Sequence, residues 1–181
     1  MPNAKAFMLK GLLRTGLFNA STKKEALSNS SEPINLLFTD KNGNRINTND
    51  LKGKTIFINF WATWCPPCIA EMGSINSLYN KLKSDPRVVF ILVDADGNLS
   101  QSSVFMEKRQ YNLPVYSIAG AVPDSLFSGT LPTTIIIDAG GKLVQKHEGI
   151  ANWDTDKVIQ FLTSPPAPLL KERGASPQKS L

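Results

Sequence analysis

Residues 55–72 read Thr-Ile-Phe-Ile-Asn-Phe-Trp-Ala-Thr-Trp-Cys-Pro-Pro-Cys-Ile-Ala-Glu-Met. The apolar, β-branched and aromatic run at 56–61 predicts a buried strand, and a helical pattern opens in the second half of the Cys-x-x-Cys. Pro67 suits the first turn of that helix, where a missing N–H costs nothing. Cys65 is therefore expected at the helix N-terminus, where unpaired N–H groups and the helix dipole favour a thiolate over a thiol.

Cys65 and Cys68 are the only two cysteines of the chain. A thiolate attacks disulfides, and a second thiol three residues away can resolve the mixed disulfide that forms. A structural zinc site needs four ligands, and the single histidine, His147, cannot complete such a set. A structural disulfide across two residues would restrain little of the unfolded chain. The pair therefore predicts redox chemistry and no metal site.

Residues 59–68 (Asn-Phe-Trp-Ala-Thr-Trp-Cys-Pro-Pro-Cys) resemble the active-site segment of the thioredoxin superfamily. The Pro-Pro dipeptide between the cysteines, with Glu71 three residues after Cys68, is similar to the TlpA/ResA-like branch of that superfamily. The resemblance extends over residues 32–162. It implies the thioredoxin fold, an α/β fold of three layers in which helices flank a mixed sheet. The branch also has an additional N-terminal β-hairpin.

The resemblance further implies a thiol–disulfide oxidoreductase, favoured as a reductase of protein disulfides that works through a mixed disulfide. Cys65 is then the attacking thiolate and Cys68 the resolving thiol. Trp64, Pro66 and Pro67 would shape the surroundings of the thiolate where the substrate binds. Because the disulfide itself is the redox centre, we expect no metal and no organic cofactor.

Glu71 lies one helical turn beyond Cys68, on a stripe that continues through Ile75 and Leu78. A carboxyl group on this inward stripe would have a raised pKa and could relay a proton to or from the buried thiol. On spacing alone, a water-facing glutamate in the first helical turn fits equally well. The resemblance favours the relay, because thioredoxin has a proton-accepting aspartate where this chain has Asn59, which cannot titrate.

The remaining elements follow from apolar runs and turn residues. A strand after the helix is expected to run parallel to the first strand, and the last two strands are expected to be antiparallel. His147 is expected on the surface of the last strand. The expected elements are a hairpin of strands 36–40 and 45–47, a helix to about residue 83, strands 88–93 and 114–117, a helix at 99–111, strands 133–138 and 143–148, and a final helix from residue 152.

A second motif, Gly-Thr-Leu-Pro-Thr-Thr-Ile-Ile-Ile-Asp, spans residues 129–138. Proline is acceptable at the first residue of a strand. In the thioredoxin superfamily this proline has a cis peptide bond and lies against the Cys-x-x-Cys, so the resemblance implies a cis bond before Pro132. The backbone of Leu131 would then be free to pair with a substrate strand beside Cys65.

The net charge of +5 comes from the two ends of the chain. Basic residues outnumber acidic ones by four in residues 1–25 and by two in residues 164–181. Because the body of the chain is nearly neutral, a nucleic-acid-binding surface is not expected. Residues 4–18 form a short basic amphipathic pattern that favours equally a contact with a membrane surface and a helix docked on the domain.

Three regions are therefore predicted. Residues 1–33 are the basic amphipathic segment and a linker, residues 34–163 the thioredoxin-like domain, and residues 164–181 a proline-rich disordered tail. The resemblance implies a monomer in the bacterial cell envelope, periplasmic and membrane-associated, that receives electrons from a membrane protein and passes them to envelope proteins such as apocytochromes. Since residues 4–18 lack the uninterrupted apolar stretch of a signal peptide, a cytoplasmic location is the alternative.

Two other functions are compatible with the same fold. A redoxin-type peroxidase needs a peroxidatic cysteine in a Pro-x-x-x-Thr-x-x-Cys context, which the sequence lacks. A copper-handling assembly factor uses cysteines separated by three residues together with a histidine, whereas Cys65 and Cys68 are separated by two. Assays of peroxide consumption and copper binding distinguish these alternatives from disulfide chemistry.

Overall fold

Strand β3 (Thr55–Trp61) lies inside the sheet of the computed structural model, which describes Gly11, Ala20 and residues 33–164. Phe57 and Trp61 pack in a core on one face of the sheet, and Ile58 and Phe60 pack in a second core on the other face. A strand that is buried on both faces needs apolar side chains in both directions. This explains why residues 56–61 are almost continuously apolar.

The sheet has seven strands in the order β2-β1-β5-β4-β3-β6-β7. Strands β3, β4 and β5 are parallel, whereas β6 and β7 run antiparallel to their neighbours. The predicted N-terminal hairpin is confirmed, and β1 extends the sheet by pairing antiparallel with β5. The other strands are β1 (Leu37–Asp40), β2 (Arg45–Asn47), β4 (Val88–Asp94), β5 (Val115–Ile118), β6 (Thr133–Ile137) and β7 (Leu143–Glu148).

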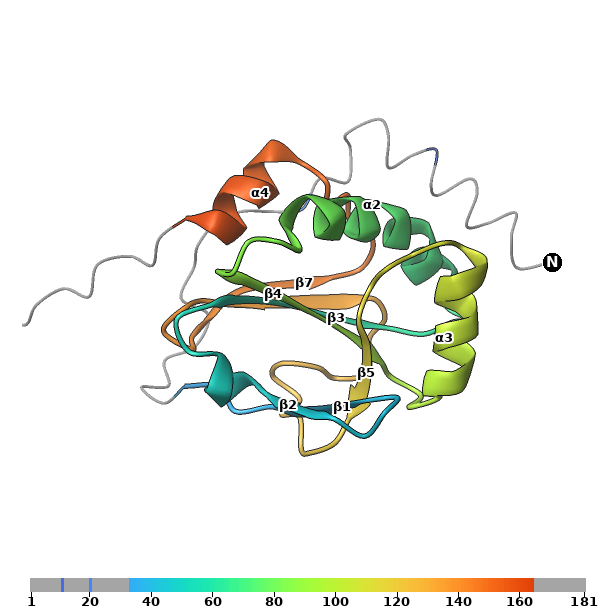
Figure 1. Ribbon diagram of the computed structural model, residues 1–181, viewed down its shortest axis with the longest axis horizontal. Helices are drawn as coiled ribbons and strands as arrows, with labels where there is room; N and C mark the ends of the chain where they lie inside the picture. Colours follow the sequence, from blue (N-terminus) through green and yellow to red (C-terminus); the bar gives the residue numbers. More distant parts are fainter. Residues whose placement is uncertain (1–10, 12–19, 21–32, 165–181) are drawn as a thin grey trace, which may run out of the picture.

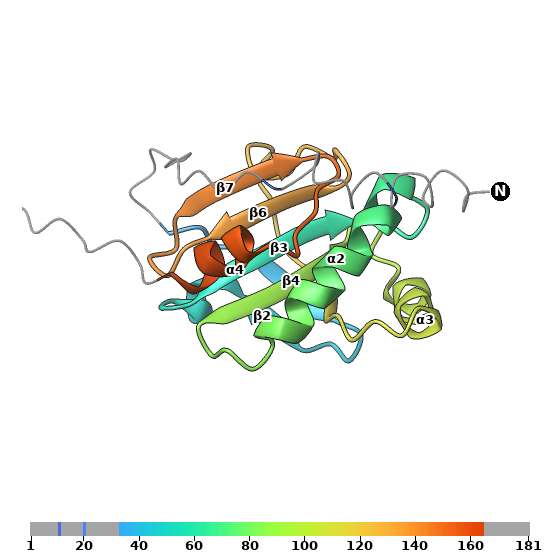
Figure 2. The same ribbon diagram turned by 90° about the horizontal axis from the view of Figure 1, so that it is seen from above.

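Helices cover both faces of the sheet. Helices α2 (Pro66–Leu82), α3 (Leu99–Lys108) and α4 (Asp156–Thr163) contribute to one core. The short 3-10 helix η1 (Thr48–Leu51) packs on the other. Figure 1 shows α2 and α4 on one side of the strands and η1 with the hairpin on the opposite side, and Figure 2 shows α2 and α4 lying over the strands. The predicted α/β thioredoxin fold, a mixed sheet flanked by helices, is confirmed.

The last helix begins later than predicted. α4 starts at Asp156, and the hydroxyl of Thr155 caps it by accepting the N–H of Val158 at 3.3 Å. The residues before this cap are held by other contacts, because the Asp154 carboxylate accepts hydrogen bonds from Ser77 and Lys81 of α2. The segment expected to start the helix at residue 152 is therefore a loop that is fastened to α2.

The N-terminal and C-terminal predictions lie almost entirely outside the described residues. Ala20 is an exception: it is buried against the core on the α2 side, and its N–H donates to the Asn152 carbonyl at 3.4 Å. In the described part of the chain, no helix combines the length and the apolar composition needed to cross a bilayer.

Candidate active site

Cys65 is the N-cap residue of α2, as the sequence predicted. Pro66 and Pro67 occupy the first two helical positions and have no N–H to offer. The N–H of Cys68 is therefore the first helix amide available to the Cys65 sulfur, and it donates to Sγ at 3.3 Å. This donor and the positive end of the helix dipole would favour a thiolate on Cys65 once the pair is reduced.

The two cysteines are joined by a disulfide, with their Cα atoms 5.3 Å apart. Cys65 retains 3% of its surface exposed, whereas Cys68 retains none. Of the two cysteines, only Cys65 therefore presents any surface to an incoming thiol or disulfide. The order of events expected from the sequence, with Cys65 reacting first, agrees with this difference in access.

Trp64 precedes Cys65 and is 62% exposed. Its indole N–H donates to the carboxylate of Asp96, in the turn that follows β4. The hydrogen bond fixes one edge of the ring, while the apolar faces remain accessible. Trp64 and Val104 are the only large apolar side chains that are exposed in the described residues.

Leu131 and Pro132 lie at the end of the sheet where Cys65 lies. The pairing of β3 with β6 reaches Phe60 and Thr133, so the residues just before β6 adjoin the segment that leads from β3 to Cys65. The peptide bond between Leu131 and Pro132 is cis, as predicted. The Pro132 carbonyl accepts the N–H of Gly149 at 2.8 Å, whereas the backbone N–H and carbonyl of Leu131 have no partner within the described chain.

Glu71 is buried with 1% exposure, which confirms the inward position and excludes the water-facing alternative. Its Oε1 accepts the side-chain N–H of Asn59 at 2.9 Å, and its Oε2 accepts the backbone N–H of Ala151 at 3.0 Å and the indole N–H of Trp153 at 3.2 Å. Burial raises the pKa of the Glu71 carboxyl to about 8, and the three donors oppose that rise.

Asn59 connects Glu71 to β6. Its side-chain nitrogen donates to Thr134 Oγ1 at 2.8 Å as well as to Glu71, while its Oδ1 is buried without a partner in the described residues. Asn59 is on β3 and fully buried. Asn59 is the one polar residue within the apolar run at 56–61, and its hydrogen bond to the Glu71 carboxyl explains its position.

Sequence reasoning missed the loop between β7 and α4 as part of this site. Ala151 and Trp153 supply two of the three donors to Glu71. His147 lies on the last strand, as expected, but it is partly buried and not fully on the surface: its Nε2 is enclosed, and its ring meets the Trp153 ring edge-on with centroids 5.6 Å apart. For the loop, the available signal was Trp153, a tryptophan just before a helix cap. A buried indole N–H requires an acceptor, which Glu71 provides.

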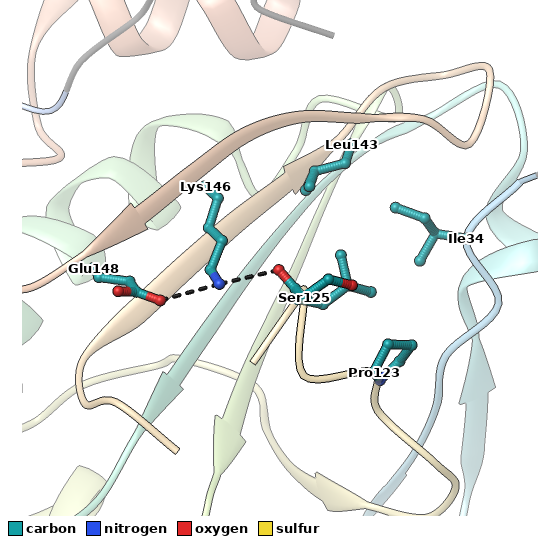
Figure 3. A pocket seen from close by; sticks show the side chains of 7 residues that line it. Ile34, Pro123, Ser125, Leu143, Lys146 and Glu148 are labelled. Atoms are coloured by element: carbon teal, nitrogen blue, oxygen red, sulfur yellow. Dashed lines mark hydrogen bonds and ion pairs between the residues drawn. The ribbon is translucent and has the colours of Figure 1, made fainter. Parts of the chain in front are cut away.

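Metal-ligating side chains and the larger of two cavities are the features to compare with this site in the described residues. No group of three His, Cys, Asp or Glu side chains there is placed to hold a metal ion. A cavity of about 670 Å³ lies on the opposite side of the sheet, and Figure 3 shows Lys146 within it, donating to the Ser125 carbonyl and paired with Glu148, each at 3.0 Å. The charges in that cavity therefore satisfy one another.

Comparison with known proteins agrees with this geometry. The Redoxin family matches residues 20–160. The thiol–disulfide oxidoreductase ResA of Bacillus cereus is 40% identical over 127 residues, which cover 70% of this chain and 73% of that protein. ResA of Bacillus subtilis is 37% identical over 127 residues, 70% of each chain.

Solved structures show the same fold. The pneumococcal exposed lipoprotein thioredoxin of Streptococcus pneumoniae has 25% identity and a TM-score of 0.56, with 71% of this chain and 98% of that chain covered. StoA of Bacillus subtilis has 23% identity and a TM-score of 0.57, with 71% and 97% covered. Together with the Cys-Pro-Pro-Cys pair at the start of α2, these matches show that the chain belongs to the Redoxin family, among the ResA-type thiol–disulfide oxidoreductases.

Proposed function

We propose that this oxidoreductase works as a reductase of protein disulfides, with Cys65 as the nucleophile. In the reduced protein, the Cys65 thiolate attacks a substrate disulfide, forms a mixed disulfide and releases one substrate thiolate. Cys68 then loses its proton and attacks Cys65 Sγ, which closes the Cys65–Cys68 disulfide and releases the second substrate thiol. Two electrons pass to the substrate, and a donor dithiol restores them. The observation that carries this proposal is the position of Cys65 at the N-cap of α2, with the resolving Cys68 one helical turn before a buried carboxyl, that of Glu71.

Glu71 is proposed to accept the proton that Cys68 gives up. A thiol is a poor nucleophile until it is deprotonated, and Cys68 is fully buried, so a nearby protein group is needed to take its proton. In the disulfide form the pKa of Glu71 is about 8, so at neutral pH most Glu71 carboxyl groups hold a proton after the reaction. The proton is available for return when the donor reduces the disulfide.

Substrate binding is proposed to use the surface around Cys65. Trp64 offers an exposed apolar ring, and the unpaired backbone of Leu131 can pair with an extended substrate segment. Pro66 and Pro67 are half-buried and complete this surface beside Cys65, whereas Pro132 is buried and contributes through its position next to Leu131. Recognition through backbone pairing and one apolar contact suits protein substrates of varied sequence.

Trp64→Ala is expected to raise the KM for a protein disulfide about tenfold while kcat changes little. The ring is 62% exposed, so its removal takes away substrate contact area and little of the core. Steady-state kinetics with insulin measures the two constants, and thermal unfolding serves as the check on folding. Equal kinetic constants for the variant and the unchanged protein would remove Trp64 from the binding surface.

The direction of electron flow is tested by the reduction potential of the Cys65–Cys68 pair. The potential is measured by equilibration with dithiothreitol or glutathione, with tryptophan fluorescence as the signal, because Trp64 adjoins Cys65. A reductase is expected to have a potential below roughly −230 mV, on the reducing side of the glutaredoxins. A value near roughly −120 mV, as for strong oxidants, would contradict a reductase.

The disulfide is proposed to be the only redox centre, with no metal and no organic cofactor. Copper handling would need a third ligand beside the cysteines, and among the described residues no such set of three is present. Peroxide consumption by the reduced protein tests the peroxidase alternative. We expect it to be slow compared with insulin reduction, because the cysteines lack the peroxidatic context.

The protein is proposed to act as a monomer in the bacterial cell envelope and to receive electrons from a membrane protein. Similarity to a lipoprotein described as exposed supports this location. Fractionation of cells with an antibody against the chain tests it, and recovery only with cytoplasmic markers would contradict it. The conclusion that the protein acts on protein thiols does not depend on this location.

A further inference from the structure

Only the nitrogen of the Asn59 side-chain amide makes hydrogen bonds; its oxygen makes none in the described residues. Its nitrogen donates both hydrogens, to Glu71 Oε1 at 2.9 Å and to Thr134 Oγ1 at 2.8 Å. Its oxygen is buried without a partner, although the side chain is fully enclosed. A buried amide oxygen without a hydrogen bond is unfavourable, so the environment of this group requires an explanation.

The orientation seen here is the one that suits an ionised Glu71, because all three neighbours donate N–H groups to its oxygens. Oε2 accepts two N–H groups, from the Ala151 backbone and the Trp153 indole, and neither of these groups can become an acceptor. A proton taken up by the carboxyl therefore belongs on Oε1. Oε1 faces the Asn59 nitrogen. After protonation, the Oε1–H group and the Asn59 N–H would therefore be two hydrogen-bond donors that point at each other.

We propose that Asn59 is a positioning residue that turns its side-chain amide over when Glu71 takes up a proton. After a half turn of the amide, Oδ1 occupies the place of the nitrogen and accepts the new Oε1–H of Glu71. Thr134 accommodates the change because a hydroxyl group both donates and accepts: its Oγ1 accepts now, and its O–H donates to Oδ1 afterwards. The proton that leaves Cys68 Sγ ends on Glu71 Oε1, and only hydrogen bonds are exchanged.

The turned orientation exchanges the unpaired group of Asn59: the oxygen lacks a partner now, and the nitrogen would lack one after the turn. The bond to Glu71 changes from N–H···Oε1 to Oε1–H···Oδ1, so the protonation state of Glu71 decides between the two orientations. The half turn lets Glu71 keep a hydrogen bond at Oε1 in both protonation states, which suits a group that gains and loses a proton in each cycle.

Other ionisable groups lie on the elements around Glu71, and the titration of Glu71 must be distinguished from theirs. Cys68 of α2 is in the disulfide, and His147 of β7 contacts the Trp153 ring. Asp154, in the same loop as Trp153, pairs with Lys81 at 2.6 Å near the surface. His147 is the only histidine of the chain, so a His147→Gln variant shows which inflection of a pH titration belongs to Glu71.

The test is an NMR titration of the full-length oxidised protein labelled with ¹³C and ¹⁵N. The Glu71 carboxyl carbon reports its protonation, and the nuclear Overhauser effect between the Asn59 side-chain amide protons and the Thr134 methyl group reports the orientation of the amide. We expect this effect to be strong above the midpoint of Glu71 and to be lost below it. An effect that persists unchanged on both sides of the midpoint would overturn the proposal.

Glu71→Gln is a matched control, because its side chain offers an N–H at the place of Oε1 and an oxygen at the place of Oε2. This variant should fix Asn59 in the turned orientation at every pH. If it shows instead the pattern of the ionised protein, the proposal is wrong.

A pair of variants gives an independent test of the same idea. Trp153→Phe removes an N–H donor that binds the carboxylate more strongly than the protonated carboxyl, so it should raise the pKa of Glu71. Asn59→Leu removes a group that, if it turns, hydrogen-bonds both the ionised and the protonated carboxyl. It should therefore raise the pKa of Glu71 by less than half of the rise in Trp153→Phe. An amide that never turns predicts the reverse order, because its bond to Glu71 is the shorter of the two.

The inference rests on the proposed role of Glu71 as proton acceptor, but its test involves no turnover. A negative NMR result leaves disulfide reduction by Cys65 intact. Conversely, a protein without reductase activity can still show the turning of Asn59. The two proposals therefore fail separately.

Discussion

Cys65→Ser is expected to reduce the rate of insulin reduction to the uncatalysed background. Serine cannot form a mixed disulfide, and the remaining thiol of Cys68 is fully buried behind the first turn of α2. Cys68 also does not occupy the N-cap position, which favours a thiolate on Cys65. The measurement is turbidity of reduced insulin with dithiothreitol as the electron source, compared with the unchanged protein at the same concentration.

Cys68→Ser is the matched control for this prediction. It keeps the nucleophile and removes the resolving thiol, so turnover is lost while the mixed disulfide accumulates. Non-reducing electrophoresis with mass spectrometry should then find substrate linked to Cys65. If Cys65→Ser keeps insulin reduction, or if Cys65→Ser captures substrate and Cys68→Ser does not, the two cysteines have been assigned the wrong roles.

The cysteine chemistry could be predicted from the sequence because it depends on neighbouring residues. A buried strand, a Cys-x-x-Cys and a helix start follow one another within residues 55–72, and local propensities specify all three. The hairpin at 37–47 was predictable for the same reason, since its turn residues lie between two short strands. For Glu71, helical spacing indicated an inward position, but it left exposure to water as an equal alternative.

The surroundings of Glu71 could not be predicted, because its partners are distant in the sequence. Trp153 and Ala151 are about 80 residues away, and Thr134 reaches the site only through Asn59. The apolar pattern at 133–138 indicates a strand but not which face meets Asn59. The loop before α4 was assigned to the helix because its contacts with α2 are invisible to local propensity. The partial burial of His147 was not predicted for the same reason, because it depends on the contact with Trp153.

The stability of the folded protein is expected to depend on pH through Glu71. In the folded, disulfide-bonded protein its pKa is raised from 4.5 to about 8, chiefly by desolvation. Below about pH 4.5 the carboxyl is protonated in both the folded and the unfolded state. As the pH rises, the unfolded chain releases this proton while the fold retains it, so the free energy of unfolding falls. The fall ends above pH 8, where both states are ionised.

Glu71→Gln should remove this dependence, because glutamine does not titrate. At 1.4 kcal/mol per pH unit, the carboxyl accounts for a loss of about 5 kcal/mol between pH 4.5 and pH 8, an order-of-magnitude figure. Urea unfolding of the oxidised unchanged protein and the oxidised Glu71→Gln variant at pH 5, 6.5 and 8 gives the free energy of unfolding of each against pH. The difference between these two profiles measures the loss due to Glu71, because the titration of all other groups cancels. The variant should gain stability relative to the unchanged protein at each step upward in pH. A constant difference would mean that Glu71 is ionised throughout this range, and the proton accepted from Cys68 would then have to reside elsewhere.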